Sequence, residues 1–169
     1  AWLAIADPAA AVELLGGLRA VAGDRVTAFE LVSRQSLDLV LQHIPGARDP
    51  LAGAYPWYVL VELTDTRIDA GLEALLEEEV GQGVDAGLIL DGTIAASTTQ
   101  AAALWALREN ISEAQKREGV SIKHDISVPV SEIPRFIALA GERLEAAYPG
   151  LRIVCFGHLG DGNLHYNQS

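Results

Sequence analysis

Short strand-like runs alternate with helical segments along the chain, and this alternation constrains the fold more than any other feature of the sequence. Several of these runs carry apolar side chains at every second position, which indicates burial on one face only. Strands of this kind suit an antiparallel sheet. Strands are expected at residues 1–7, 25–33, 57–65, 84–92, 120–129, 151–158 and 163–167. Helices are expected at residues 8–23, 34–44, 67–83, 98–119 and 130–150.

The order of these elements predicts an α+β domain. We expect an antiparallel sheet with helices packed mainly on one face and with ferredoxin-like repeats. A doubly wound parallel sheet is the alternative arrangement for interleaved strands and helices. The length of 169 residues fits a single domain, and 50% hydrophobic with 21% charged residues is the balance of a globular chain.

The chain is strongly acidic, with 12 Lys and Arg against 23 Asp and Glu and a net charge of −11. This balance argues against a nucleic-acid partner, because phosphates are met by clustered positive charge. No stretch approaches the ~20 apolar residues of a membrane span. Because an acidic surface repels small carboxylates, any anion-binding site needs cations of its own.

Cys155 is the single cysteine, and it lies in the apolar run IVCF. One cysteine cannot form an internal disulfide, and its apolar neighbours predict a buried structural thiol. The N-terminus shows no basic leader, so the sequence predicts a cytoplasmic location.

The segment CFGHLGDGNLHY, residues 155–166, is the part of the chain that most suggests chemistry. Its central glycines can adopt turn conformations between two strand-like runs, which predicts a hairpin. With a loop at residues 159–162, His158 faces Asn163, and His165 is a diagonal neighbour about 7–8 Å away. With a six-residue loop, the two histidines face each other directly. Either register places both imidazoles on one face.

Two imidazoles on one face suit Zn²⁺ or another divalent first-row metal. A catalytic metal normally has three protein ligands, so a further carboxylate would have to come from elsewhere. The spacing alone fits equally well two unrelated histidines beside a turn.

Basic and hydroxyl side chains upstream are candidate anion ligands. Arg108 and Ser112 are four residues apart, hence on one face of the expected helix, and Arg108 has the planar fork that suits a carboxylate. A surface salt bridge to Glu109 or Glu113 is the alternative role for Arg108. Lys123 alternates with apolar neighbours and is expected to point away from the core, where simple solvation is its alternative.

His124 follows Lys123 directly. The same alternation places it on the apolar side of its strand, so we expect a buried, hydrogen-bonded core histidine.

The segment CFGHLGDGNLHYN resembles the signature of the C-terminal domain of the FAD-linked oxidases, a family that includes D-lactate dehydrogenase, the glycolate oxidase flavin subunit and D-2-hydroxyglutarate dehydrogenase. Four further segments look like blocks of this family, and the likeness covers nearly the whole chain. They are residues 27–33, 58–63, 104–114 and 122–134.

The resemblance implies roles for individual residues. It implies that Arg108 grips a substrate carboxylate and that Ser112 and Lys123 bind the remaining polar groups of the substrate. Asn167 is implied to lie beside the substrate. Ser112 departs from a threonine found in some members, which keeps the hydroxyl and loses a methyl group.

The resemblance also implies the activity: this chain would be the substrate- and metal-binding part of an FAD-dependent oxidoreductase that oxidises a D-2-hydroxy acid to the 2-keto acid. The substrate would be of the lactate, glycolate or 2-hydroxyglutarate type. His158 and His165 would be ligands of a divalent metal, with zinc expected. No catalytic residue is assigned to this chain, and its contacts with FAD are left open.

The chain is expected to be a fragment, residues 1–169 of a C-terminal substrate-binding domain, because it contains no methionine, even at position 1. The resemblance implies an N-terminal domain that binds most of the FAD. It also implies a segment beyond residue 169 with a third metal ligand, a glutamate, followed by a catalytic histidine. The fragment alone is therefore expected to be inactive. An electron acceptor that takes electrons from the flavin is an expected partner. A homodimer is a further expected possibility for the assembly.

Two other functions stay open. The first is a domain of a flavin-dependent transferase like alkylglycerone-phosphate synthase, which would need a phosphate pocket and a lipid-tail pocket. The second is a metal-binding module without catalytic activity.

Overall fold

The computed structural model describes residues 1–169 and contains one seven-stranded sheet in the order β4-β1-β3-β2-β6-β7-β5. Every pair of neighbouring strands is antiparallel. The strands are β1 (Trp2–Ile5), β2 (Val26–Ser33), β3 (Trp57–Leu63), β4 (Ile89–Thr93), β5 (Asp125–Ser127), β6 (Ile153–His158) and β7 (Asn163–Gln168). The helices are α1 (Pro8–Ala22), α2 (Arg34–His43), α3 (Leu72–Asp85), α4 (Thr98–Glu109), α5 (Ile111–Glu118) and α6 (Ile133–Ala147). The predicted α+β class and antiparallel sheet are confirmed, and the parallel alternative is wrong.

The topology contains the predicted ferredoxin-like arrangement. The elements β1-α1-β2-β3-α3-β4 form a sheet in the order β4-β1-β3-β2, with α2 inserted between β2 and β3. The elements β5-α6-β6-β7 repeat the first part of this pattern, because β7 lies between β5 and β6 as β3 lies between β1 and β2. The two units join edge to edge where β2 pairs with β6.

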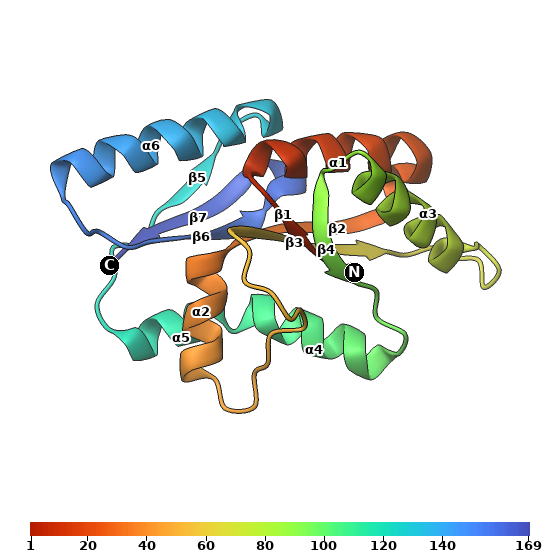
Figure 1. Cartoon of the computed structure of the whole chain (residues 1–169), viewed down its shortest axis with the longest axis horizontal. Helices are drawn as coiled ribbons and strands as arrows, with labels where there is room; N and C mark the ends of the chain where they lie inside the picture. Colours follow the sequence, from red (N-terminus) through yellow and green to blue (C-terminus); the bar gives the residue numbers. More distant parts are fainter.

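Helices cover both faces of the sheet, which corrects the expectation that they pack mainly on one face (Figure 1). We call the side with α1, α3 and α6 the α1 face and the side with α2, α4 and α5 the α4 face. Central strands alternate between two apolar cores: Leu3 and Ile5 belong to the core of the α1 face, whereas Trp2 and Ala4 belong to the core of the α4 face. Because both faces of β1 are apolar, both need cover from helices.

The long helix expected at residues 98–119 is divided at Asn110 into α4 and α5. The amide of the Asn110 side chain donates to the carbonyl oxygen of Ala106 at 2.8 Å, a local bond that competes with regular helix geometry. Arg108 therefore lies at the end of α4, and Ser112 lies in the first turn of α5. None of the helices combines the length and the apolar character that a membrane crossing requires.

Candidate functional site

The hairpin of β6 and β7 has the four-residue loop, residues 159–162, and not the six-residue one. Phe156 pairs with His165 across the hairpin, so the same register places His158 opposite Asn163 and diagonal to His165. Gly162 closes the loop with φ of 71°, a left-handed conformation that favours glycine.

Both hairpin histidines lie on the α4 face. Phe156 belongs to the core of that face, and side chains two residues apart in a strand share a face, so His158 points to the same side. His165 is the cross-strand partner of Phe156 and lies beside it, with ring centroids 4.6 Å apart. The sequence prediction that the two imidazoles share one face is therefore confirmed.

Glu30 on β2 holds His158 and Arg108 together. The side chain of Glu30 is almost fully buried, and one of its carboxylate oxygens is hydrogen-bonded to Nδ1 of His158. The other oxygen accepts a hydrogen bond from Nε of Arg108 at 2.7 Å. The partner of Arg108 is thus a carboxylate far away in the sequence and not Glu109 or Glu113.

Arg108 is buried apart from a small part of its surface, and its guanidinium carbon lies 4.9 Å from the centroid of the Phe156 ring. Only its Nε is used in a hydrogen bond with the protein. The two terminal nitrogens of the guanidinium therefore keep their donors for another group, in the planar geometry that suits a carboxylate.

His165 has a carboxylate partner as well. Its Nδ1 lies 2.5 Å from Oδ1 of Asp125, which is the residue opposite it on β5. In both histidines the bond at Nδ1 leaves Nε2 without a protein partner. Metal-binding histidines commonly have this pattern, because the carboxylate fixes the tautomer and makes the other nitrogen a better ligand.

Asn167 is buried on the same face, next to α5. Its amide donates to Oε1 of Gln115 at 2.9 Å, and its oxygen accepts from the backbone amide of His124 at 3.1 Å. The amide nitrogen of Gln115 is buried without a hydrogen-bond partner. Asn167 is therefore held rigidly in the protein, and the neighbouring Gln115 is the group with an unused donor.

Lys123 and Ser112 are exposed, and neither side chain has a hydrogen bond or an ion pair with the protein. The register of β5 and β7 places Lys123 opposite Asn167, so it lies on the α4 face with the histidines. His124 is also exposed, which corrects the prediction of a core histidine. The reason is that β5 is the edge strand of the sheet, and the segment leading into it has solvent on one side.

The residues present fit a metal ion only in part. No group of three or more His, Cys, Asp and Glu side chains has the geometry to hold one. The two open Nε2 atoms offer two nitrogen ligands, whereas the carboxylates of Glu30 and Asp125 are already bound to the opposite ring nitrogens. A complete centre would need at least one more ligand from outside residues 1–169.

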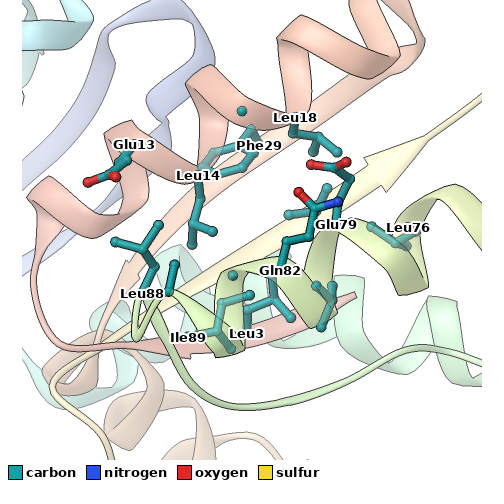
Figure 2. A pocket seen from close by; sticks show the side chains of 15 residues that line it. Leu3, Glu13, Leu14, Leu18, Phe29, Leu76, Glu79, Gln82, Leu88 and Ile89 are labelled. Atoms are coloured by element: carbon teal, nitrogen blue, oxygen red, sulfur yellow. The ribbon is translucent and has the colours of Figure 1, made fainter.

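A small polar hollow of about 70 Å³ lies beside His158 and is also lined by Glu30, Arg19 and Asp161. A larger hollow of about 230 Å³ lies on the α1 face, between α1 and α3. Leu14, Phe29 and Ile89 are among the apolar side chains around it, with Glu13, Glu79 and Gln82 as its polar lining (Figure 2). It contains no cation, so it does not suit a small acid.

Cys155 is buried, and burial raises the pKa of its thiol well above the usual range. A thiol that stays protonated is a poor nucleophile and a poor metal ligand. The prediction of a structural thiol is confirmed.

The fold and the site define an α+β domain with ferredoxin-like units that gathers an arginine and two carboxylate-bound histidines on one face of its sheet. Residues 1–169 match the model of the family described as FAD linked oxidases, C-terminal domain. The chain belongs to this family, as its resemblance indicated.

Curated relatives of the chain have one name in common. The chain is 36% identical over its whole length to "D-2-hydroxyglutarate dehydrogenase, mitochondrial" of Arabidopsis thaliana, and it covers 30% of that protein. It is 42% identical, over 85% of its length, to "D-2-hydroxyglutarate dehydrogenase" of Xanthomonas citri pv. viticola, of which it covers 29%. It is 38% identical, over 86% of its length, to "D-2-hydroxyglutarate dehydrogenase, mitochondrial" of Rattus norvegicus, of which it covers 26%. The chain thus spans less than a third of the length of these relatives.

Sequence reasoning did not identify Glu30 or Asp125. A signal for Glu30 was present, because it is a single charged residue inside the apolar strand AFELV. A carboxylate in such a strand is costly to bury unless it is paired, so it indicates a specific partner. Asp125 gave no such signal, because its strand alternates polar and apolar residues and an exposed aspartate is ordinary there.

Proposed function

We propose that this chain is the substrate- and metal-binding part of an FAD-dependent oxidoreductase that oxidises a D-2-hydroxy acid to the 2-keto acid. A substrate of the 2-hydroxyglutarate type is favoured over lactate and glycolate. The observation that carries the proposal is the buried carboxylate of Glu30, which binds both Arg108 and His158 and leaves their outer nitrogens available. The family and the names of the relatives support the FAD and the substrate class.

The substrate would be held by cations that the acidic surface otherwise lacks. The terminal nitrogens of Arg108 would bind one carboxylate in a two-pronged manner. Lys123 lies on the same face with an exposed ammonium group and would bind a second carboxylate. Two separate cations suit a dicarboxylate better than lactate or glycolate, each of which has one carboxylate. Ser112 and Asn167 would line the same site.

His158 and His165 would hold a divalent metal, expected to be zinc, through Nε2. Such a metal would supply Lewis-acid polarisation of the substrate hydroxyl, and the FAD would supply the acceptor for the hydride. The third ligand and the base that accepts the hydroxyl proton would belong to other parts of the whole protein. Within this chain, the two carboxylates keep the imidazoles in the tautomer that a metal requires.

The transferase alternative would need an apolar pocket for a lipid tail. Apolar hollows lie on both faces of the sheet, one of about 230 Å³ on the α1 face and one of about 440 Å³ between α2 and α4, beside Leu107. The hollows therefore do not separate the two functions, and the relatives, which are named dehydrogenases, support the oxidoreductase.

The proposal is tested in the full-length protein with the variant Arg108→Ala. We expect the KM for D-2-hydroxyglutarate to rise about 10–100-fold, because a charge-assisted bond of about 1.5–3 kcal/mol is lost. Steady-state dye reduction measures this constant. Arg117→Ala is the matched control, because it removes an arginine from the exposed side of α5. An unchanged KM in Arg108→Ala would remove this residue from the site.

The metal assignment is tested in the same protein with His158→Ala and His165→Ala. Each variant is expected to lose bound metal, measured by elemental analysis, together with turnover. Normal metal content in either variant would show that the assignment is wrong.

A further inference from the structure

Glu30 lies deeper in the protein than a carboxylate normally does. It is 1% exposed, on a central strand between β3 and β6, and Arg108 is the other charged residue among the buried ones. Removing an ionised carboxylate from water costs several kcal/mol unless its partners compensate. Packing does not require a carboxylate at this place, because the neighbouring Val32 shows that a β-branched apolar side chain suits the same face of β2.

The two oxygens of Glu30 have different partners. One accepts from Nε of Arg108, and the other is bonded to Nδ1 of His158. An ionised carboxylate only accepts hydrogen bonds, so in the neutral imidazole of His158 the ring proton is on Nδ1 and the lone pair is on Nε2. In the same way, the bond at Nε of Arg108 restricts the plane of the guanidinium and leaves its two terminal nitrogens without a hydrogen bond to the protein.

We propose that Glu30 is a positioning residue that sets the tautomer of His158 and the orientation of Arg108 at the same time. This inference rests on the proposed function of the two residues. Its consequence is that metal affinity and carboxylate affinity depend on one buried side chain that contacts neither ligand. A change at Glu30 should weaken both kinds of binding together.

Asp125 provides an internal comparison, because it has the same bond to His165 in a different environment. Its side chain is 72% exposed, whereas that of Glu30 is 2% exposed. Water can replace the carboxylate of Asp125, but it has no access to the place of Glu30. The effect of neutralising Asp125 is therefore expected to be much smaller than the effect of neutralising Glu30.

The test uses Glu30→Gln in the full-length protein, because glutamine has nearly the same shape. Its oxygen can accept from Arg108, and its amide then donates to Nδ1 of His158, which moves the ring proton to Nε2. We expect Zn²⁺ affinity, measured by competition with a chromophoric chelator, to fall about 10–100-fold. The KM for D-2-hydroxyglutarate should rise, because one oxygen now holds Arg108 without a charge. Asp125→Asn should lower Zn²⁺ affinity less than Glu30→Gln.

A second measurement does not depend on metal or on activity. Nitrogen-15 NMR of the metal-free protein with labelled histidine reports which ring nitrogen carries the proton. We expect His158 to be protonated at Nδ1 in the wild type and at Nε2 in Glu30→Gln. Glu62→Gln is the matched control: this carboxylate on β3 accepts a hydrogen bond from Trp105 of α4 and contacts no histidine. It should leave the tautomer and both affinities unchanged.

The outcomes separate the inference from the proposed function. If His158→Ala keeps wild-type Zn²⁺ affinity, the proposed metal site is wrong. If His158→Ala loses Zn²⁺ and Glu30→Gln keeps both the wild-type affinity and the Nδ1 proton, only the role of Glu30 is overturned. If Glu30→Gln does not fold, Glu30→Asp takes its place. The shorter side chain cannot reach both partners, so unchanged Zn²⁺ affinity and unchanged KM in that variant would also overturn the role.

Discussion

The two faces of the sheet are built on different principles. The buried side chains of the α1 face form an apolar core around residues such as Leu15, Leu31 and Val59. The α4 face has an apolar core as well, but Glu30 and Arg108 are buried in it as an ion pair. Apolar packing dominates the first face, whereas the second combines packing with a buried ion pair.

This difference indicates which face carries function. Replacing a buried ion pair by apolar residues of similar volume is often neutral or stabilising, so stability does not explain why a protein keeps one. The α4 face keeps one, and the terminal nitrogens of Arg108 and Nε2 of His158 have no hydrogen-bond partner in the protein. The hollow between α1 and α3 is larger than the one beside His158, but no charged group is buried on the α1 face to orient a ligand.

The largest expected effect tests the buried pair itself. Arg108→Met keeps the length and the apolar stem but leaves Glu30 with one partner fewer, so we expect the free energy of unfolding to fall by about 3–5 kcal/mol. Urea unfolding followed by circular dichroism measures this change. A loss below about 1 kcal/mol would mean that the pair contributes no more than a surface salt bridge.

Leu15→Ala is the matching change on the α1 face, because Leu15 is buried against the sheet from α1. It should cost about 2–4 kcal/mol through the cavity that it leaves. The KM for D-2-hydroxyglutarate in the folded full-length protein should stay unchanged. A raised KM in this variant would contradict the division between the two faces.

The next prediction concerns the loop of the β6–β7 hairpin, which carries both histidines on the α4 face. In Gly162→Ala the added Cβ would lie 2.1 Å from the carbonyl oxygen of Val128, at a φ of +71°. Both the backbone conformation and the contact are unfavourable, so we expect a loss of about 3 kcal/mol. The thermal midpoint is the measurement.

Gly160→Ala is the control in the same loop, since its new Cβ would meet the end of the flexible Arg19 side chain at 3.3 Å and Cβ of Phe29 at 3.9 Å, an ordinary van der Waals distance. We expect it to lower the midpoint much less than Gly162→Ala. Equal losses in both variants would show that the loop responds to any added side chain, and not to the particular backbone of Gly162.

The smallest expected effect is at the other end of the α4 face, where α5 ends. Hydrogen bonds from Arg152 and then from His43 lower the pKa of Glu118 below its usual value. A carboxyl group with a lowered pKa in the folded state stabilises the protein above its unfolded pKa, and this contribution is lost as the pH falls below about 4.5. Glu118→Gln should therefore lower the thermal midpoint at pH 7, and the difference from the wild type should shrink by pH 3. A difference that does not depend on pH would contradict this assignment.

The sequence by itself determined the α+β fold class, the antiparallel sheet and the hairpin that carries His158 and His165. Alternation of apolar residues indicated the antiparallel sheet, and the spacing of His158 and His165 around a glycine turn placed both on one face. These conclusions hold because they depend on local geometry: the period of a strand is two residues, and a tight turn fixes the register. The division of the long helix at Asn110 was not predicted, because a single weaker helix former such as asparagine does not by itself end a helix.

Only the tertiary structure decided what the polar side chains contact. Glu30 and Arg108 are 78 residues apart, and they meet because α4 packs on the face of the sheet to which Glu30 points. Glu30 meets His158 because the two residues are opposite each other where β2 pairs with β6. The exposure of His124 likewise depends on β5 being an edge strand. Contacts of this kind depend on which elements become neighbours, and no periodicity within one segment contains that information. For this reason the histidines could be predicted from the sequence, whereas the carboxylate that orients one of them could not.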